Sequence, residues 1–489
     1  MKALRKLTGE TAIYGMPSII GRFLNYWLFP YWTHVFVNQS NLGQVANMYA
    51  YVAFLFVILT YGMETGYFRF ASRENNKATV FSSVFYLISI TSVLFLIAVI
   101  GLRNPIAKAL QLEGYAVYIV MMGITVAFDV VSTIPFAKLR LEHRPIRFAV
   151  IKFVNIGTNI LLNLFFLTLC PYLAQQFPGG LIDNVYRPEF GIGYVFLANM
   201  VATLVTFVML IPHMQLKIDF DFALMRRMLK YSFPILIVGI TGMVNQNIDK
   251  ILLPMMLPDS AEPMKQLGIY AAAFKMAVIL NMFIQAFRFA FEPFFFSQKG
   301  GDNDKAMYVI VMKYFAIFGM IIFLGLSTFI DLFKVIVAPQ YREGIGIVPI
   351  VLLANLFMGI YFTLSLWYKI TDKTKYGAYQ GIIGSVITIA INVLLIPVMG
   401  YYASAWAILA CFVSMTLISY FSGKKHYDVP YKVKNFLFYL FVALILFGVY
   451  WFVRTDSEPY FWLAILVNVI FVALIVVKEK HEILTLIKK

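Results

Sequence analysis

The chain has 489 residues, of which 61% are hydrophobic and only 13% are charged, and its mean hydropathy is +0.79. A soluble domain carries about 25% charged residues, so this chain has too little polar surface to cover itself in water, and lipid must be its solvent. The formal net charge is +16, from 40 Lys and Arg against 24 Asp and Glu. Cys170 and Cys411 both lie in apolar stretches, which excludes a disulfide framework and a cysteine metal site.

The N-terminal segment imitates a signal peptide, because Lys2, Arg5 and Lys6 precede an apolar run. That run, however, continues to about Phe36, contains Arg22 near its middle, and lacks a small-x-small cleavage site. We therefore expect this segment to be the first membrane span.

About 20 mostly apolar residues are needed to cross a bilayer as a helix. Applied along the chain, this rule predicts an all-α polytopic protein with about fourteen transmembrane helices. The predicted spans are 9–36, 44–68, 79–100, 115–137, 148–170, 191–212, 231–254, 266–296, 307–330, 344–367, 376–396, 401–422, 434–453 and 459–477.

The distribution of positive charge gives an independent test of these spans. If the N-terminus is cytoplasmic, only seven of the 40 Lys and Arg lie in segments on the opposite side, and four others, Arg22, Lys250, Lys275 and Arg288, lie well inside spans. One missed span would reverse every later loop and destroy this asymmetry, since Lys and Arg concentrate in cytoplasmic loops. The pattern predicts that both termini are cytoplasmic, and it argues against nucleic acid as a partner.

Internal similarity indicates two lobes. Spans 1 and 7 open with related motifs, YGMP and YSFP. Superposing Asn163 in TNILLNLFFL on Asn392 in ITIAINVLLI also brings Arg140 onto Lys369. Transporters are often built from such repeats. We expect an N-lobe of six spans, a C-lobe of six spans and a terminal pair with a basic tail. Their predicted bounds are 1–217, 218–425 and 426–489.

Ionisable side chains inside a bilayer cost about 2.5–3.5 kcal/mol each on insertion scales, so they are functional candidates. Arg22 and Asn25 lie on one face of span 1, with no acid three or four residues from Arg22. The Arg22 side chain lies too deep in the span to reach the headgroups easily, and we expect it to face a hydrated cavity.

Span 8 carries a second polar stripe, formed by Asn281, Gln285, Arg288 and Glu292. Arg288 and Glu292 are one helical turn apart, so mutual neutralisation is the structural alternative to a binding role. A guanidinium recognises phosphate oxygens through paired hydrogen bonds and keeps its charge in a low dielectric. Deep arginines in two spans therefore favour a cargo that carries phosphate or carboxylate.

Several acids are candidates for coupling transport to a proton or sodium gradient. Asp129 is a lone acid near the middle of span 4, and Glu64 lies near the cytoplasmic end of span 2. Asp249 and Lys250 end span 7, where they could also be ordinary near-interface residues. Together with Glu292, the three acids form the predicted coupling set, and no cofactor or metal is expected.

At this point the chain resembles a known family, the polysaccharide (Wzx-type) flippases of the MOP superfamily, which are related to MurJ and to the MATE exporters. The resemblance runs the whole length of the chain, and its last motif is the most specific. The motifs are GMPSIIGRFLNYWLFP (15–30), YGMETGYFRFAS (61–72), LGIYAAAFKM (267–276), FRFAFEPFFF (287–296) and TKYGAYQGIIGSVITIAINVLLIPVMGYYASAWA (374–407).

This resemblance implies two lobes that form a V-shaped central cavity, opened alternately to each side of the bacterial inner membrane. It implies a flippase that moves an undecaprenyl-pyrophosphate-linked oligosaccharide unit from the cytoplasmic to the periplasmic leaflet for O-antigen, capsule or exopolysaccharide synthesis. The implied partners are membrane lipid, the lipid-linked glycan, and the polysaccharide polymerase and chain-length proteins. The predicted substrate-binding residues are Arg22, Asn25, Lys250, Asn281, Gln285 and Arg288.

Other functions predict different sequence features. A lipid II flippase would carry further arginines just after span 1 and in span 2, where this chain has Asn25, His34 and Glu64. A cation-coupled MATE-like exporter predicts an acidic lobe cavity and usually twelve spans. An enzyme of the same pathway needs a large outside loop, and the longest one here, 171–190, is short. A major-facilitator transporter would show an Asp in the turn after span 2, which reads GYFRFASREN.

Overall fold

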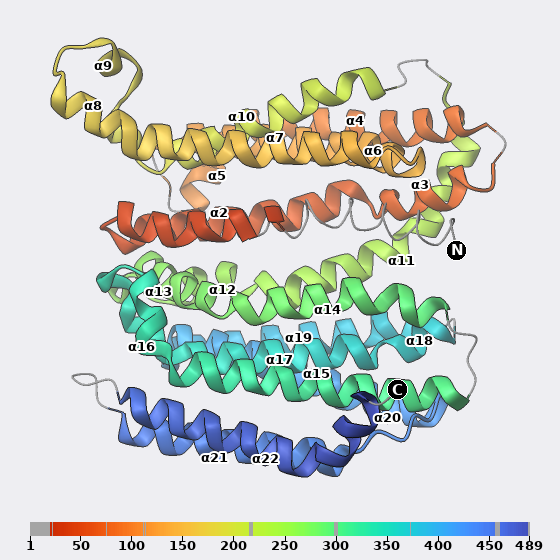
Figure 1. Cartoon of the computed structure of the whole chain (residues 1–489). Coiled ribbons are helices and arrows are strands. Elements are labelled where there is room, and N and C mark those ends of the chain that lie inside the picture. The colour runs from red at the N-terminus through yellow and green to blue at the C-terminus, as the bar shows by residue number, and fades with distance from the viewer. Residues whose placement is uncertain are drawn as a thin grey trace. The chain divides into compact units, whose positions relative to one another are not determined.

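The structure is a computed structural model that describes residues 20–21, 23–74, 76–110, 112, 114–214, 219–297, 302–371, 373–454 and 460–487. Within these ranges every regular element is a helix (Figure 1). The predicted all-helical membrane fold is thereby confirmed.

The described residues contain twelve helical segments that are long and apolar enough to cross a membrane, and a bent helix pair raises the number to thirteen. These thirteen correspond in order to the predicted spans from the second to the fourteenth. The first predicted span, 9–36, lies partly outside the described residues, and its described residues 20–21 and 23–35 are helical.

The chain packs as two units, one made of Met1–Val35 and Gln44–Met243 and the other of Phe36–Gly43 and Val244–Lys489. The predicted lobes describe sequence repeats, and their bounds and the V-shaped cavity stay predictions. The helices from α2 to α11 are α2 Gln39–Thr60, α3 Met63–Ala71, α4 Lys77–Gly101, α5 Arg103–Ala109, α6 Ala116–Leu141, α7 Pro145–Leu164, α8 Cys170–Gln176, α9 Leu181–Val185, α10 Gly193–Leu210 and α11 Phe222–Asn247.

The remaining helices belong to the second unit. They are α12 Asp249–Met256, α13 Pro263–Met276, α14 Val278–Ser297, α15 Asp302–Thr328, α16 Ile330–Phe333, α17 Val348–Leu364, α18 Leu366–Ile370, α19 Lys375–Met399, α20 Tyr401–His426, α21 Val433–Val453 and α22 Phe461–Ile487. Short 3-10 turns cover Pro188–Phe190, Ile211–His213, Asp259–Ala261, Lys334–Ile336 and Pro339–Ile347, and a π-helical turn, Phe165–Leu169, joins α7 to α8.

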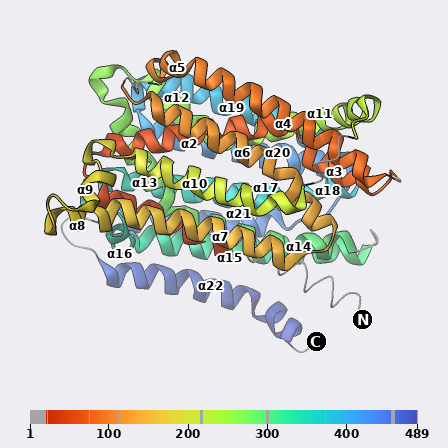
Figure 2. The same cartoon turned by 90° about the horizontal axis from the view of Figure 1, so that it is seen from above.

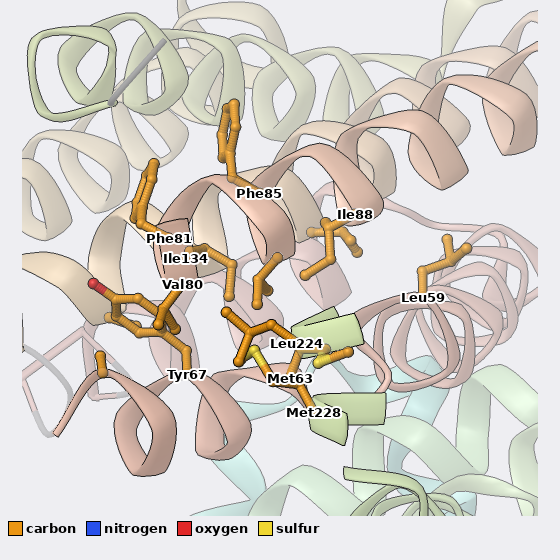
Figure 3. Packing of buried hydrophobic residues seen from close by; sticks show 14 of the residues in the cluster. Leu59, Met63, Tyr67, Val80, Phe81, Phe85, Ile88, Ile134, Leu224 and Met228 are labelled. Carbon is orange, nitrogen blue, oxygen red and sulfur yellow. The ribbon is translucent and has the colours of Figure 1, made fainter. Parts of the chain in front are cut away.

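The first unit has an apolar core where α2, α3, α4, α6 and α11 meet (Figure 3). Met63, Phe81 and Met228 are fully buried in it. The second predicted span breaks within this region, because Tyr61 and Gly62 have φ values of 52° and 66°. A Cβ at Gly66, one turn into α3, would lie 2.5 Å from the Ser232 Oγ of α11. The small residues thus let α3 pack directly against α11.

Two asparagines that the sequence comparison superposes make equivalent hydrogen bonds. The Asn163 side chain donates to the Asn159 carbonyl one turn earlier at 2.8 Å and accepts from the Trp32 indole at 3.0 Å. Asn392 donates to the Thr388 carbonyl at 2.8 Å and accepts from the Ser404 hydroxyl at 2.8 Å. Both side chains are fully buried, and this shared role supports the predicted repeat.

The segment Phe36–Gly43, although it precedes most of α2, belongs to the second unit. The buried Tyr341 hydroxyl donates to the Phe36 carbonyl at 2.8 Å, and the Gln39 side-chain amide donates to the Gln340 carbonyl at 2.9 Å. The backbones of α2 and α13 then touch at two glycines. A Cβ on Gly43 would lie 1.9 Å from the Met264 carbonyl oxygen, and one on Gly268 would lie 2.0 Å from the Gln39 carbonyl oxygen.

The terminal pair α21–α22 packs along α15 (Figure 1), and Figure 2 shows α22 at the edge of its unit. Three polar contacts attach the pair along its length. The first joins Arg454 to Asp331 through two hydrogen bonds of 2.9 Å, and the second joins Asn468 to the Thr328 hydroxyl at 2.8 Å.

The third contact lies toward the other end of α15. Lys313 pairs with Glu479 at 2.7 Å and with Glu482 at 2.6 Å, and the Tyr439 hydroxyl donates to Glu479 at 2.6 Å. Lys313 and Glu479 are almost fully buried. Removing one member would leave the other as an uncompensated charge, so the contact fixes how α22 sits on α15.

Replacement of Gly43 by Ala should lower stability, because the added methyl overlaps a backbone carbonyl that cannot rotate away. Overpacking costs about 1–3 kcal/mol, and we expect a lower midpoint of thermal unfolding in detergent. Gly157→Ala in α7 is the matched control, since nothing lies within 4 Å of its Cβ position. Glycine costs a helix about 0.5–1 kcal/mol relative to alanine, so this variant should be as stable as the parent or more so. Equal midpoints for the two variants would contradict the close approach.

A pH-dependent prediction follows from Asp331, which lies between two membrane spans. Burial opposes its ionisation, but hydrogen bonds from Arg454 and Lys334 outweigh burial and hold the pKa of this carboxyl below its usual range. A depressed pKa means stability that is present above the unfolded value of about 3.9 and is lost as pH falls through the folded value. Breaking a buried pair costs about 3–5 kcal/mol.

Asp331→Asn should therefore unfold at a lower temperature than the parent at pH 7. The unfolding temperatures of the two proteins should converge only below about pH 4. Asp259→Asn, at an exposed position, is the control and should follow the parent at every pH. A difference between Asp331→Asn and the parent that stays constant down to pH 3 would show that the ion pair does not stabilise the fold.

Candidate transport site

The polar stripe of span 8 lies on α14, which begins directly after a sharp bend. The axes of α13 and α14 differ by 46°. Such a bend frees carbonyls from the helical pattern, and the Asn355 amide of α17 donates to the Ala277 carbonyl at the bend at 3.1 Å. Asn281 and Gln285 follow one turn apart and are joined by a 3.1 Å hydrogen bond. The Asn355 hydrogen bond therefore supports the bend, and the bend sets the direction of α14 and of its polar stripe.

Arg288 continues this stripe and is half-buried. Its guanidinium carbon lies 4.3 Å from the centre of the Phe362 ring of α17. A cation over an aromatic face gains about 0.5–2 kcal/mol. Stacking uses the face of the planar group, whereas phosphate oxygens are recognised by the N–H donors at its edge, so the two contacts are compatible. The arrangement holds a positive charge within the span in a fixed orientation.

Asp249 and Lys250 follow the break between α11 and α12. The Asp249 carboxylate is almost fully buried and accepts a hydrogen bond from the Tyr270 hydroxyl of α13. Lys250 approaches the same carboxylate at 3.4 Å and lies 4.6 Å from the centre of the Phe274 ring. Because it also donates to the Gln246 carbonyl at 3.0 Å, the ammonium group is well coordinated. The structure therefore places this acid and this base together, within one cluster.

Asp129 lies in the interior of the first unit. The Thr203 hydroxyl of α10 donates to its carboxylate at 3.1 Å. Lys152 of α7 is close enough to interact with it electrostatically, and this ammonium group packs 4.1 Å from the centre of the Phe136 ring. No salt bridge joins Asp129 to another of the described residues. A carboxylate held by a hydroxyl, near a cation but not paired with it, can gain or lose a proton without breaking an ion pair.

Unlike Asp129, Glu64 forms a direct ion pair, with Arg140 of α6. Lys152 interacts electrostatically with Glu64 and Arg140 as well as with Asp129. The two predicted acids of the first unit thus share one lysine, which the sequence analysis did not select. Its position near the start of a predicted span made it look like an ordinary interface residue.

A polar face on α10 was not among the predicted site residues. Asn199, Thr203 and Thr206 are spaced i, i+4 and i+7, and they contact three different helices. Asn199 donates to the Tyr49 hydroxyl at 3.2 Å, and Thr206 accepts from Asn155 at 2.9 Å. The spacing was visible in NMVATLVT, but small hydroxyl residues also occur in helices that pack closely without any function.

The remaining predicted residues are only partly placed. Asn25 lies on the exposed surface of its helix. Arg22 and the side chain of Glu292 lie outside the described residues, so their predicted roles stay predictions. What the structure brings together is Asn281 with Gln285, Asp249 with Lys250, and Asp129 with Glu64 around one lysine.

Comparisons with known proteins identify a family for the chain. The sequence model described as "Polysaccharide biosynthesis protein" matches residues 7–298, which is more than half of the chain. No protein in the curated collection of sequences matches significantly.

Among solved structures, one described as lipid II flippase MurJ in an inward-closed conformation is similar, with a TM-score of 0.71 and 16% identity. The match covers 96% of this chain and 99% of that one. An inward-facing multidrug resistance MATE family transporter of the MOP superfamily gives 0.64 at 12% identity, covering 85% and 94%. An outward-facing conformation of a transporter of that family gives 0.56 at 13% identity, covering 85% and 94%.

These matches confirm the resemblance to the polysaccharide flippases of the MOP superfamily and the multi-pass membrane fold. The similar structures share the fold and are transporters or a flippase rather than enzymes. The chain belongs to the polysaccharide biosynthesis protein family.

Proposed function

We propose that this protein is a flippase that moves an undecaprenyl-pyrophosphate-linked oligosaccharide unit from the cytoplasmic to the periplasmic leaflet of the bacterial inner membrane. The unit would then serve the synthesis of O-antigen, capsule or exopolysaccharide. The observation that carries the proposal is a guanidinium held within a membrane span, Arg288 on Phe362, in a member of a polysaccharide biosynthesis family.

The physical task is to carry a polar headgroup across hydrocarbon. Burying a hydroxyl without a compensating hydrogen bond costs about 2–7 kcal/mol, so an unassisted oligosaccharide is stopped by the sum over its hydroxyls. A protein that offers amides and hydroxyls along the path replaces the lost water. Gln285 lies one turn and Asn281 two turns from Arg288, where they can contact sugars while the arginine binds the diphosphate.

Arg22 would supply the second guanidinium, and Lys250 and Asn25 would extend the polar path. Both termini would be cytoplasmic, as the asymmetry of Lys and Arg indicates. The polysaccharide polymerase and chain-length proteins would receive the product. A lipid II flippase is the second candidate, favoured by the structural match to MurJ over almost the whole chain, and the glycan carried would separate the two.

For coupling, we propose Asp129 as the group that exchanges a proton or a sodium ion. Among the predicted acids, Glu64 is neutralised by Arg140, and Asp249 is bound by both Tyr270 and Lys250. Asp129 accepts one hydroxyl hydrogen bond and lies near Lys152. Protonation of Asp129, or binding of a sodium ion to it, would change the electrostatic forces on Lys152. Because Lys152 of α7 also interacts with Glu64 of α3 and Arg140 of α6, the change would act on three helices.

Arg288→Ala should reduce export of surface polysaccharide and binding of the lipid-linked unit. Hydrogen bonds to charged groups contribute about 1.5–3 kcal/mol, so apparent affinity should fall by about tenfold to a hundredfold. Binding would be measured with purified protein and an undecaprenyl-pyrophosphate oligosaccharide, and export in cells that contain equal amounts of each variant.

Arg22→Ala should behave in the same way. Arg288→Lys keeps the charge but loses the planar pair of donors, and its affinity should lie between those of Arg288→Ala and the parent. The control is Arg226→Ala, at an exposed position outside the proposed site. Normal binding and export in both Arg288→Ala and Arg22→Ala would overturn the proposed function. Binding of lipid II in preference to the other glycan would favour the second candidate.

Asp129→Asn should bind the lipid-linked unit normally but lose translocation driven by an ion gradient in proteoliposomes, whereas Asp129→Glu should retain part of it. The control is Glu74→Gln, which removes an acid from a surface pair with Arg227. Testing a proton gradient and a sodium gradient separately identifies the ion. Gradient-driven transport at the parent's rate in Asp129→Asn would exclude this residue from coupling.

A further inference from the structure

Gln380 of α19 is a buried amide whose hydrogen bonding is incomplete. The residue is 1% exposed, and neither its amide oxygen nor its amide nitrogen has a hydrogen-bond partner among the described residues. An amide buried without a partner gives up its hydrogen bonds to water and regains none. Because buried polar groups almost always have a partner, either in the protein or in ordered water, these two atoms point to a ligand that binds here.

The neighbours of Gln380 follow from the pairing of α19 with α20, two antiparallel helices joined at Gly400. A Cβ on Gly384 would lie 2.6 Å from the Met415 Sδ of α20. Gln380 comes one turn before Gly384, and Ser419 comes one turn after Met415, so Gln380 and Ser419 lie at the same level. Ser419 is fully buried. The two side chains thus belong to one layer in the interior of the second unit.

Two hydrogen bonds in this layer are longer than usual. The Trp367 indole of α18 donates to the Ser419 hydroxyl at 3.4 Å, and the Asn245 amide of α11 donates to the carbonyl of Gly381, next to Gln380, at 3.4 Å. Hydrogen bonds from N–H to O usually measure about 2.9–3.0 Å. A space of about 10 Å³ borders Trp367 and Ser419, and one water molecule needs at least about this volume. The layer therefore combines weakly bonded polar groups with room for a very small ligand.

The amide of Gln380 also determines the charge of that ligand. Its oxygen accepts hydrogen bonds and its nitrogen donates them, so the ligand must both donate and accept. A cation would be repelled by the N–H group, and an anion would be repelled by the oxygen. Gln380, Ser419, Trp367 and Asn245 are all uncharged, so they could not neutralise an ion. We propose that a buried water molecule bridges Gln380 and Ser419.

This water connects helices without introducing charge. Buried waters typically make about three hydrogen bonds and are costly to remove. Gln380 supplies a donor and an acceptor from α19, and Ser419 supplies a hydroxyl from α20 that is already bonded to Trp367 of α18. Asn245 accepts from Ser385 at 2.9 Å, so the end of α11 is attached beside the same layer. The water is thus a structural ligand that joins α18, α19 and α20 where α11 meets them.

The direct test is X-ray hydroxyl-radical footprinting of the full-length protein in detergent, read by peptide mass spectrometry. The X-ray pulse converts bound water into hydroxyl radicals, which oxidise the side chains nearby. Trp367 and Met415, which are 5% and 3% exposed, should therefore be oxidised despite their burial. Met228, fully buried in the apolar core of the first unit (Figure 3), is the internal control and should stay unmodified. In Gln380→Leu the oxidation of Trp367 and Met415 should be lost.

A second measurement uses the sign of a stability change. Gln380→Met replaces the amide by an apolar side chain of similar length. If the position held only an unpartnered amide, removing that amide would raise the midpoint of thermal unfolding. With a bound water, the substitution removes the ligand of the water as well, and we expect the midpoint to fall by about 2–4 °C. Gln176→Met, at an exposed position of α8, is the control and should leave the midpoint unchanged.

Three results would overturn the proposal. The first is a parent protein in which Trp367 and Met415 are as unreactive as Met228, or in which their oxidation persists after Gln380→Leu. The second is a higher unfolding midpoint in Gln380→Met. The third is a footprint or midpoint that changes when choline replaces sodium in the buffer, since this would identify a cation as the ligand. None of these results depends on which cargo the protein transports.

Discussion

The constraint on which the structure depends is that a charged or polar group in hydrocarbon must find a partner within the protein. In the first unit Glu64 is paired with Arg140, and in the second Lys313 is paired with Glu479. Each of these pairs joins helices that are distant in sequence. Since an unpaired ion is far more costly in a membrane than at a water-exposed surface, these few contacts determine which helices neighbour one another. Apolar contacts alone do not discriminate in this way, because lipid chains offer equivalent packing.

The same constraint distinguishes structural charges from candidates for function. A charge that is neutralised by a direct ion pair can be separated from its partner only at a high cost in free energy. Arg288 rests on the Phe362 ring, and Asp129 rests on a threonine hydroxyl with a lysine nearby. These are the contacts on which the proposed phosphate-binding role of Arg288 and the proposed coupling role of Asp129 rest.

The sequence was sufficient for the second to the fourteenth span because hydropathy is a property of short segments. It also located Asn163 and Asn392, whose neighbours repeat in the two halves of the chain. It could not supply Tyr270 as the partner of Asp249, or Thr203 as the partner of Asp129. Those contacts depend on the rotation of each helix about its axis, which is set by packing and leaves no local pattern. Lys152 was overlooked for a similar reason, because three neighbouring groups make it notable and none is close in sequence.

Polar residues also decide where helices can break. The bend between α13 and α14 leaves the Ala277 carbonyl available to an outside donor, and Asn355 occupies that role. The chain leaves the first unit after Met243, within α11, and the helix ends at Asn247, just before Asp249 begins α12. Asn245, between these points, accepts from Ser385 at 2.9 Å and anchors the end of α11 to α19. The last turn of α11 is therefore held by a side chain of the second unit, although the preceding residues of the helix belong to the first unit.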